Sequence, residues 1–221
     1  KDNIVHIHNL NHDLFFERLG HTDWLQNNIS DGFTEMGSPY YGKYKEIYMV
    51  RLPYYNGIYN TNFRLYKLHG SVDQYPFHTK HFGIVGYIKI KKGIGKTEHY
   101  KEITNEKGEL EYHNDWLNYH SDFLSGTTSK ILRYNEPQYY EKVFKNFENN
   151  LGSSEKLVII GYGCLDEEVN NLIAKFYLNV NTKPIYMVNP YPGEAVLKFC
   201  KIFNTKLIKK SPEEIQLSDF D

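Results

Sequence analysis

The last third of the chain alternates strand-like apolar runs with segments of helical periodicity, and this alternation constrains the fold more than any other feature. Residues 157–160, 184–188 and 206–208 are short apolar runs that predict strands. Strands that alternate with helices pair in parallel through right-handed crossovers, which predicts an α/β fold. The inner faces of the two intervening helices are expected to carry Val169, Leu172, Ile173, Phe176 and Tyr177 in the first and Val196, Leu197, Phe199, Cys200 and Phe203 in the second.

The rest of the chain contributes further elements to this prediction. Residues 4–7 predict a strand that leads through a polar turn into a helical turn at 14–19. Residues 63–68 alternate apolar and polar side chains, as a strand does. An amphipathic helix is predicted at 137–151, and residues 20–62 are expected to be loop-rich with one strand at 47–52.

Length favours a single domain over two. A chain of 221 residues is long enough for one α/β domain with a core and one insertion. Residues 72–125 keep no helical period and contain a lysine-rich stretch from Lys89 and a hairpin-like turn at 106–109. They predict a small, solvated, loop-rich or β insertion within a domain that spans residues 1–221.

Composition excludes several classes of partner and site. Lys and Arg number 26 and Asp and Glu number 27, so the formal charge is −1, and we expect no bulk attraction to nucleic acid or to an anionic membrane. No apolar stretch has membrane length. Cys164 and Cys200 are too few for a four-thiolate zinc site, so no metal and a reducing, cytoplasmic setting are expected.

Polar and glycine clusters follow four of the predicted strands. Each cluster by itself has a plain structural explanation: a capped turn, a loop histidine or a tight turn. Ligands bind beyond the carboxyl ends of the strands in doubly wound sheets, so the joint placement predicts a ligand site. The clusters are Asn11 with Asp13, His69 with Gly70 and Ser71, Gly161 through Asp166, and Asn189.

These clusters resemble motifs of the sirtuins, and more closely those of the zinc-free sirtuin-like NAD hydrolase domains of bacterial antiphage defence proteins. Residues 9–13 resemble the Thr-x-Asn-x-Asp segment of that family, and residues 67–71 resemble its His-Gly segment. Residues 159–170 resemble the Gly-Tyr-Ser/Gly-x-x-Asp-x-x-Ile-Asn segment, and residues 188–190 the late strand end. The resemblance implies a Rossmann-like parallel sheet with helices on both faces.

The resemblance also implies a reaction, the cleavage of the nicotinamide–ribose bond of NAD to give nicotinamide and an ADP-ribose product. It implies that Asn11 positions the ribose or the attacking water and that His69 is the general base. Asp13 would accept a hydrogen bond from the carboxamide. The residues expected to contact NAD, which is here a substrate, are Asp13, Gly70, Ser71, Gly161, Tyr162, Gly163, Asp166 and Asn189.

Three departures from the family pattern shape these expectations. Asn9 stands where the family has Thr, and the four zinc cysteines of the deacylases are lacking, which makes a zinc-dependent deacylase the least favoured reading. The first strand and its Gly-Ala-Gly-x-Ser phosphate loop are also lacking, so we expect a C-terminal portion of such a domain. A longer natural version should turn over NAD. The alternative function is a catalytically inactive module that binds a nucleotide or a protein.

In the defence branch, the purpose would be to deplete NAD on infection. The trigger would be a regulatory domain or a phage protein outside this chain, and a homo-oligomer is expected. The sequence leaves open whether the product is linear or cyclic. It also leaves open whether the Tyr-rich residues 38–66 are a lid over the site or an aromatic surface patch.

Overall fold

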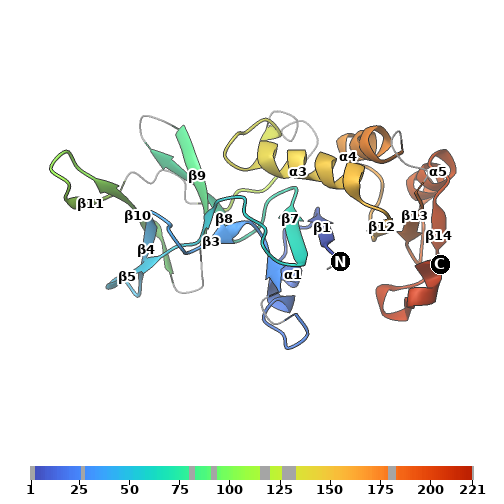
Figure 1. The fold of residues 1–221 in the computed structure, drawn as a ribbon, viewed down its shortest axis with the longest axis horizontal. Helices are drawn as coiled ribbons and strands as arrows, with labels where there is room; N and C mark the ends of the chain where they lie inside the picture. The colour runs from blue at the N-terminus through green and yellow to red at the C-terminus, as the bar shows by residue number, and fades with distance from the viewer. Residues whose placement is uncertain are drawn as a thin grey trace. The chain divides into compact units, whose positions relative to one another are not determined.

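The computed structural model describes residues 3–25, 28–79, 83–90, 94–114, 120–125, 133–178 and 183–220 (Figure 1). The chain divides into two compact units, Lys1–Lys145 and Asn146–Asp221, and each is described by itself. The boundary falls within helix α3 (Tyr140–Ser153), which confirms the helix predicted at 137–151. The single-domain organisation stays a prediction. The fold is mixed α/β, and within the described ranges antiparallel sheets contain more strands than parallel ones.

Unit 1 contains a small parallel sheet built from β1 (Val5–Asn9), β7 (Phe63–Lys67) and β2 (Ile29–Ser30), in the order β1-β7-β2. β1 runs parallel to β7 with Asn9 opposite Lys67. Helix α1 (Phe15–Leu19) follows β1. The strands predicted at 4–7 and 63–68 and the helical turn predicted at 14–19 are therefore confirmed.

Two four-stranded antiparallel sheets complete unit 1. The first has the order β3-β6-β9-β8 and the second the order β11-β10-β4-β5. The strands before residue 60 are β3 (Phe33–Thr34), β4 (Tyr40–Tyr44), β5 (Tyr48–Arg51) and β6 (Tyr54–Tyr55). The later strands are β8 (Gln74–Thr79), β9 (Gly83–Lys89), β10 (Ile94–Thr104) and β11 (Leu110–His113).

Both antiparallel sheets join segments that the sequence analysis treated separately. The strand predicted at 47–52 is confirmed as β5, but the region around it is not mainly loop, because β3, β4 and β6 also form there. Residues 72–125 contain β strands as expected. Those strands pair with the earlier ones, β9 with β6 and β10 with β4, so neither sheet belongs to residues 72–125 alone.

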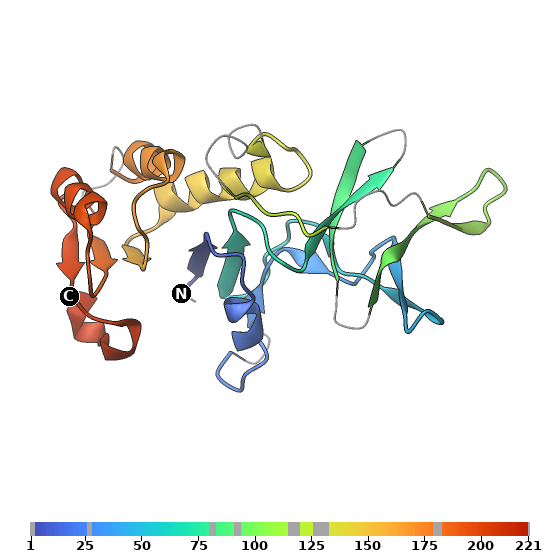
Figure 2. The ribbon, with the colours of Figure 1, turned by 180° about the vertical axis from the view of Figure 1, so that it is seen from behind.

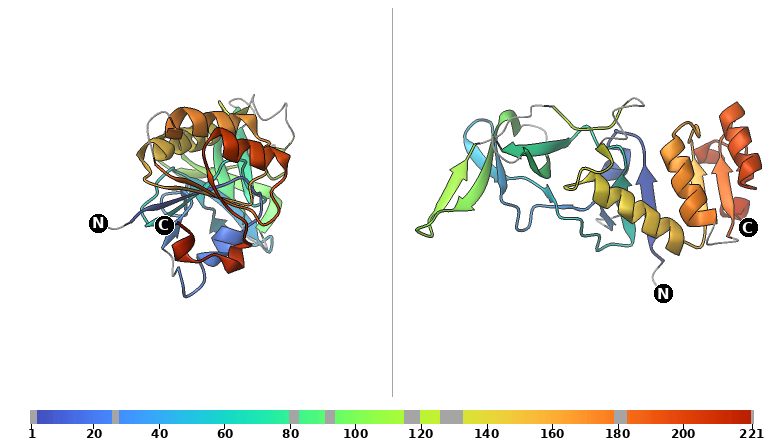
Figure 3. Two further views of the ribbon diagram at one scale, coloured as in Figure 1. Left: turned by 90° about the vertical axis from the view of Figure 1, so that its right-hand side faces the viewer. Right: turned by 90° about the horizontal axis from the view of Figure 1, so that it is seen from above.

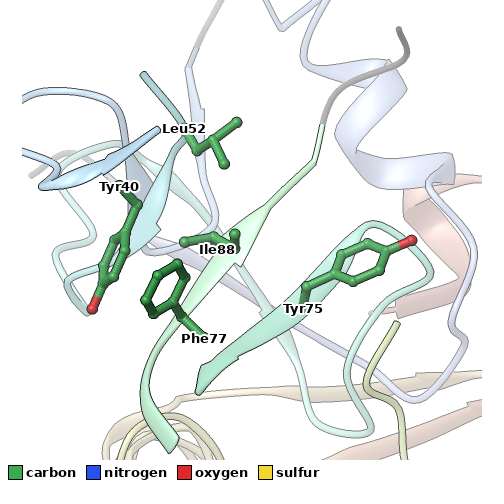
Figure 4. Packing of buried hydrophobic residues seen from close by; sticks show 5 residues of the cluster. All are labelled: Tyr40, Leu52, Tyr75, Phe77 and Ile88. Atoms are coloured by element: carbon green, nitrogen blue, oxygen red, sulfur yellow. The ribbon is translucent and has the colours of Figure 1, made fainter. Parts of the chain in front are cut away.

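The core between these strands is aromatic. Tyr40, Leu52, Tyr75, Phe77 and Ile88 are buried together, as the close view in Figure 4 shows. The ring centroids of Tyr40 and Phe77 lie 4.7 Å apart. Part of the Tyr-rich region 38–66 is therefore core, because burying an aromatic ring removes a large apolar area from water.

Unit 2 is the parallel α/β segment that the sequence predicts. Its strands β12 (Leu157–Ile160), β13 (Ile185–Val188) and β14 (Lys206–Ile208) are parallel in the order β12-β13-β14, and Figure 2 shows them side by side. Helix α4 (Glu167–Ile173), continued by a π-helical segment (Ala174–Leu178), links the first two strands, and α5 (Glu194–Ile202) links the last two. Figure 3 shows the same elements from two further sides.

The helices of unit 2 bury most of the predicted inner faces. In α4 and its π-helical continuation Val169, Leu172, Ile173 and Tyr177 are buried, and in α5 Val196 and Phe199 are buried. The inward placement predicted for Leu197 is wrong, because that side chain is 48% exposed. One face of the sheet, with Tyr186, Val188 and Ile208, packs against Ile215 and Phe220 near two 3₁₀ turns, Pro212–Glu214 and Leu217–Phe220.

In the part of the chain that the structure describes, no helix combines the length and the apolar character needed to cross a membrane.

Candidate functional site

The loops that follow β1 and β7 meet at one edge of the parallel sheet. The Leu68 amide donates to the Asn9 carbonyl at 3.0 Å, and the Val72 amide donates to the His12 carbonyl at 3.0 Å. Adjacent parallel strands end on the same side of a sheet, so these contacts follow from the pairing of β1 with β7. The structure thus brings together two of the four predicted clusters, Asn11–Asp13 and His69–Ser71.

Short side-chain bonds shape the loop after β1. The Asn9 side-chain oxygen accepts from the Asn11 amide at 2.7 Å. The Asp13 carboxylate accepts from the Phe15 amide at 2.9 Å, at the start of α1. Asn9, which stands where the resembled family has Thr, therefore closes the turn itself. The side chains of Asn11 and Asp13 are exposed and accessible to a ligand.

The His-Gly-Ser loop after β7 is more deeply buried. His69 is 5% exposed and Ser71 is fully buried. The Ser71 hydroxyl donates to the His12 carbonyl at 3.5 Å, and the imidazole rings of His69 and His12 have their centroids 6.2 Å apart. His12, which was not among the predicted site residues, therefore lies within the Asn11–Asp13 loop and against the His69–Ser71 loop.

Residues 122–124 lie directly against the His-Gly turn. Gly70 forms an antiparallel bridge with Phe123, and the Leu124 amide donates to the His69 carbonyl at 2.7 Å. Gly70 has φ +79°, and a Cβ at this position would lie 2.4 Å from the Asp122 carbonyl oxygen. Only glycine fits here, because the left-handed conformation and the close backbone both exclude a side chain.

Asp122 anchors this segment through its carboxylate. Arg133 donates to it at 2.6 Å and the Tyr87 hydroxyl donates to it at 2.9 Å. Its backbone amide donates to the Gln74 carbonyl at 2.8 Å. Burial raises the pKa of the Tyr87 phenol far above its ordinary value, and the charge of the Asp122 carboxylate raises it further. Tyr87 therefore stays a hydrogen-bond donor.

A buried charged cluster lies next to the loops that follow β1 and β7. The Lys89 ammonium is 2.7 Å from Asp31, 3.3 Å from Glu17 and 3.5 Å from Asp73. Burial alone would lower the pKa of Lys89, but the three carboxylates outweigh it and hold the pKa above its ordinary value. Lys89 belongs to the lysine-rich stretch predicted to be solvated, and for this residue that prediction is wrong.

Lys67 connects the cluster to the predicted ligand loop. Its ammonium donates to the Asp13 carbonyl and lies 3.9 Å from Glu17, which also pairs with Lys89. The Lys67 side chain is only 2% exposed, and burial lowers its pKa below the ordinary value. The sequence signal that was overlooked is the position of Lys67 at the end of a strand, immediately before the His-Gly turn.

The loop of residues 161–166 in unit 2 is held by hydrogen bonds within itself and to the start of α4. The Tyr162 hydroxyl lies 3.0 Å from both the Asp166 carbonyl and the Asn170 side-chain oxygen, and the Asn170 side-chain Nδ2 donates to the Cys164 carbonyl at 3.0 Å. Asp166 caps α4 by accepting from the Val169 amide at 3.3 Å, as predicted. Tyr162 and Asp166 thus have structural contacts in addition to the ligand contacts that the resemblance implies.

Gly161 and Asn189 lie at neighbouring strand ends of unit 2. The Gly161 amide donates to the Val188 carbonyl at 3.1 Å, and the Asn189 side-chain oxygen accepts from the Tyr191 amide at 3.0 Å. Gly161 has φ +65°, and no described atom lies within 4 Å of the position of a Cβ there. The predicted residues thus form two groups, Asn11, Asp13, His69, Gly70 and Ser71 in unit 1 and Gly161, Tyr162, Gly163, Asp166 and Asn189 in unit 2.

Within the described residues, no three His, Cys, Asp or Glu side chains are placed to hold a metal ion together. Cys164 and Cys200 are free thiols. Burial raises the pKa of the Cys164 thiol to about 11. The thiol is therefore protonated at neutral pH, which disfavours a role as nucleophile.

Neither a scan against models of protein families nor a search of the curated proteins finds a match for this chain.

Proposed function

We propose that the chain carries part of an NAD hydrolase, which cleaves the nicotinamide–ribose bond with water to give nicotinamide, ADP-ribose and a proton. The observation that supports this most is the meeting of the Asn11–Asp13 and His69–Ser71 loops at the carboxyl ends of β1 and β7. The parallel sheets of the two units, with their β-α-β connections, support the further proposal of a Rossmann-like domain.

The residues of unit 1 suit the chemistry of the ribose end. Bond cleavage leaves positive charge on the ribose, and an exposed amide such as that of Asn11 can orient the sugar or the attacking water. The Asp13 carboxylate can accept a hydrogen bond from the nicotinamide carboxamide. Imidazole accepts a proton at neutral pH, so His69 is the proposed base toward the water or a ribose hydroxyl.

The residues of unit 2, taken by themselves, suit contacts with a phosphate or a ribose. Gly161 leaves its backbone open to close approach, because nothing described lies near the position of a Cβ. Gly161 and Gly163 are proposed to admit a phosphate or the distal ribose, and Asn189 to contact the adenosine.

The test is the release of nicotinamide from NAD, measured by chromatography. It compares this chain, a version extended by whatever upstream residues its gene encodes, and a His69→Ala variant of each. His113→Ala is the matched control, because His113 is exposed on β11. Release by an unaltered form and by its His113→Ala variant, but not by its His69→Ala variant, would support the hydrolase. Equal release from the His69→Ala variant would remove His69 from the mechanism.

Asp13→Ala tests the placement of the nicotinamide ring. This substitution should raise KM for NAD more than it lowers kcat, because the carboxylate is proposed to orient the ring rather than to react. Unchanged kinetics would contradict the role of Asp13.

The second candidate is a binding module without turnover, favoured by the deep burial of His69. Calorimetry with NAD separates the two functions. Measurable NAD binding without nicotinamide release from any form would favour the module.

A further inference from the structure

Two aromatic rings with no role in the proposed chemistry lie beside the predicted base. His12 is the middle residue of the Asn11–Asp13 loop, and its ring centroid lies 4.6 Å from that of Phe123 at an interplanar angle of 38°. The His12 ring is also 6.2 Å from the His69 ring. The imidazole of His12 therefore has two aromatic neighbours, Phe123 and His69.

The backbone fixes the position of Phe123. Its bridge with Gly70 is flanked by the bond from the Leu124 amide to the His69 carbonyl and by the bond from the Asp122 amide to the Gln74 carbonyl. These backbone contacts hold Phe123 against the His-Gly turn.

The side chain of Phe123 is nevertheless not part of the core. It is 39% exposed, whereas the adjacent Leu124 is 4% exposed. A large apolar ring that the backbone places at a polar loop and leaves open to solvent presents a stacking surface to a flat ligand.

We propose that His12 and Phe123 form an aromatic wall that stacks against the flat heteroaromatic ring at the reacting end of the substrate. This inference rests on the proposed function, in which that ring is the nicotinamide of NAD. Oxidised nicotinamide carries a positive charge while it is attached to ribose, and aromatic faces attract cations. The wall therefore favours the intact, charged substrate ring over an uncharged ring.

The test of the wall measures the binding of two fragments of NAD, each of which carries one of its rings. The protein is the version extended upstream where the gene encodes one, and otherwise this chain. Nicotinamide mononucleotide carries the charged ring, and ADP-ribose carries only adenine. Phe123→Leu should raise the Kd of nicotinamide mononucleotide on the order of five- to tenfold and leave that of ADP-ribose unchanged. Phe123→Tyr and His12→Phe, which both keep a ring, should stay within about twofold of the unaltered protein.

Two controls show whether an effect on binding comes from the wall or from a general disturbance of the fold. Tyr48→Leu removes another exposed ring, on β5, and should change neither Kd. Circular dichroism of Phe123→Leu should match that of the unaltered protein. A selective loss of ADP-ribose binding would overturn the nicotinamide assignment and place adenine at the wall.

The outcomes also separate this inference from the function on which it rests. If NAD is cleaved but Phe123→Leu and His12→Ala bind nicotinamide mononucleotide normally, the wall is wrong and the hydrolase stands. If no form binds NAD or either fragment, both proposals fall.

Discussion

The Lys89 ammonium lies 2.7 Å from the Asp31 carboxylate, and this pair joins strand β9 of an antiparallel sheet to the loop that follows β2 of the parallel sheet. Glu17 of α1 and Asp73, shortly after the His-Gly turn, contact the same ammonium. One buried cation thus links α1, the residue after β2 and the segment after the His-Gly turn. The antiparallel sheet therefore supports the loops on which the chemistry is proposed to occur.

Lys89→Met should destabilise the protein by about 3 kcal/mol or more, because it leaves three carboxylates close together without their cation. Denaturant unfolding measures the change. Lys107→Met, at an exposed position in the β10–β11 turn, is the control and should stay within about 0.5 kcal/mol. Equal losses from the two substitutions would show that the cluster contributes little.

Gly70→Ala should destabilise the protein by more than Gly108→Ala does. The two glycines have similar conformations, with φ +79° and φ +81°, so both substitutions carry the cost of a left-handed alanine. A Cβ at Gly70 would meet the Asp122 carbonyl at 2.4 Å, whereas no described atom lies within 4 Å of that position at Gly108. The difference between the two losses of unfolding free energy therefore measures the cost of the contact between the new Cβ and the Asp122 carbonyl. A difference near zero would mean that residues 122–124 do not lie on the turn.

Asp166→Ala should lower stability by about 1 kcal/mol, because it removes the side chain that accepts from the Val169 amide at the start of α4. Asp166→Asn should retain most of the stability, since asparagine is an equally good cap. Thermal unfolding followed by circular dichroism gives the comparison. If Asp166→Asn lowered the stability as much as Asp166→Ala does, the carboxylate would have a role other than capping.

His8 should make the protein less stable in mild acid. Burial, with His6 nearby, lowers the pKa of His8 to about 3, and its ring stacks on Tyr66 with centroids 4.6 Å apart. An unfolded histidine titrates near pH 6.5, so between that pH and about 3 the unfolded state binds the extra proton. The stability that His8 contributes is complete above pH 6.5 and is lost as the pH falls, at up to about 1.4 kcal/mol per unit.

The measurement is the unfolding free energy of the protein and of its His8→Phe variant at pH 7 and pH 5. His8→Phe keeps a ring to stack on Tyr66, so it should reduce the loss between these two values by about 2 kcal/mol. The same replacement at the exposed His21 serves as the control. An identical pH dependence in the protein and the His8→Phe variant would contradict the assigned titration.

Local patterns along the chain predicted unit 2 closely. The strands at β12, β13 and β14, the helices between them and the Asp166 cap all follow from the periodicity of consecutive side chains. Only Leu197 departs from its expected face, because the width of the buried stripe on α5 depends on what covers it. Periodicity is a local property, so a single sequence is enough to read it.

Unit 1 shows where local patterns fail. Strands as short as Phe33–Thr34 and Tyr54–Tyr55 are too short to show a period, and they form because distant strands pair with them. The tyrosines around them therefore read as loop or surface, although Tyr40 and Tyr55 are buried.

The sequence alone determined the β-α-β order of unit 2 and the strand ends that carry Asn11, Asp13 and His69, whereas the need for glycine at position 70 comes from the close approach of Asp122. Tertiary structure decided the burial of Lys89 among three carboxylates and the contacts of Phe123 with Gly70 and His12. These depend on which segments cover one another. Solvation of a lysine or a ring is a property of its neighbours in space, and those neighbours lie tens of residues away along the chain.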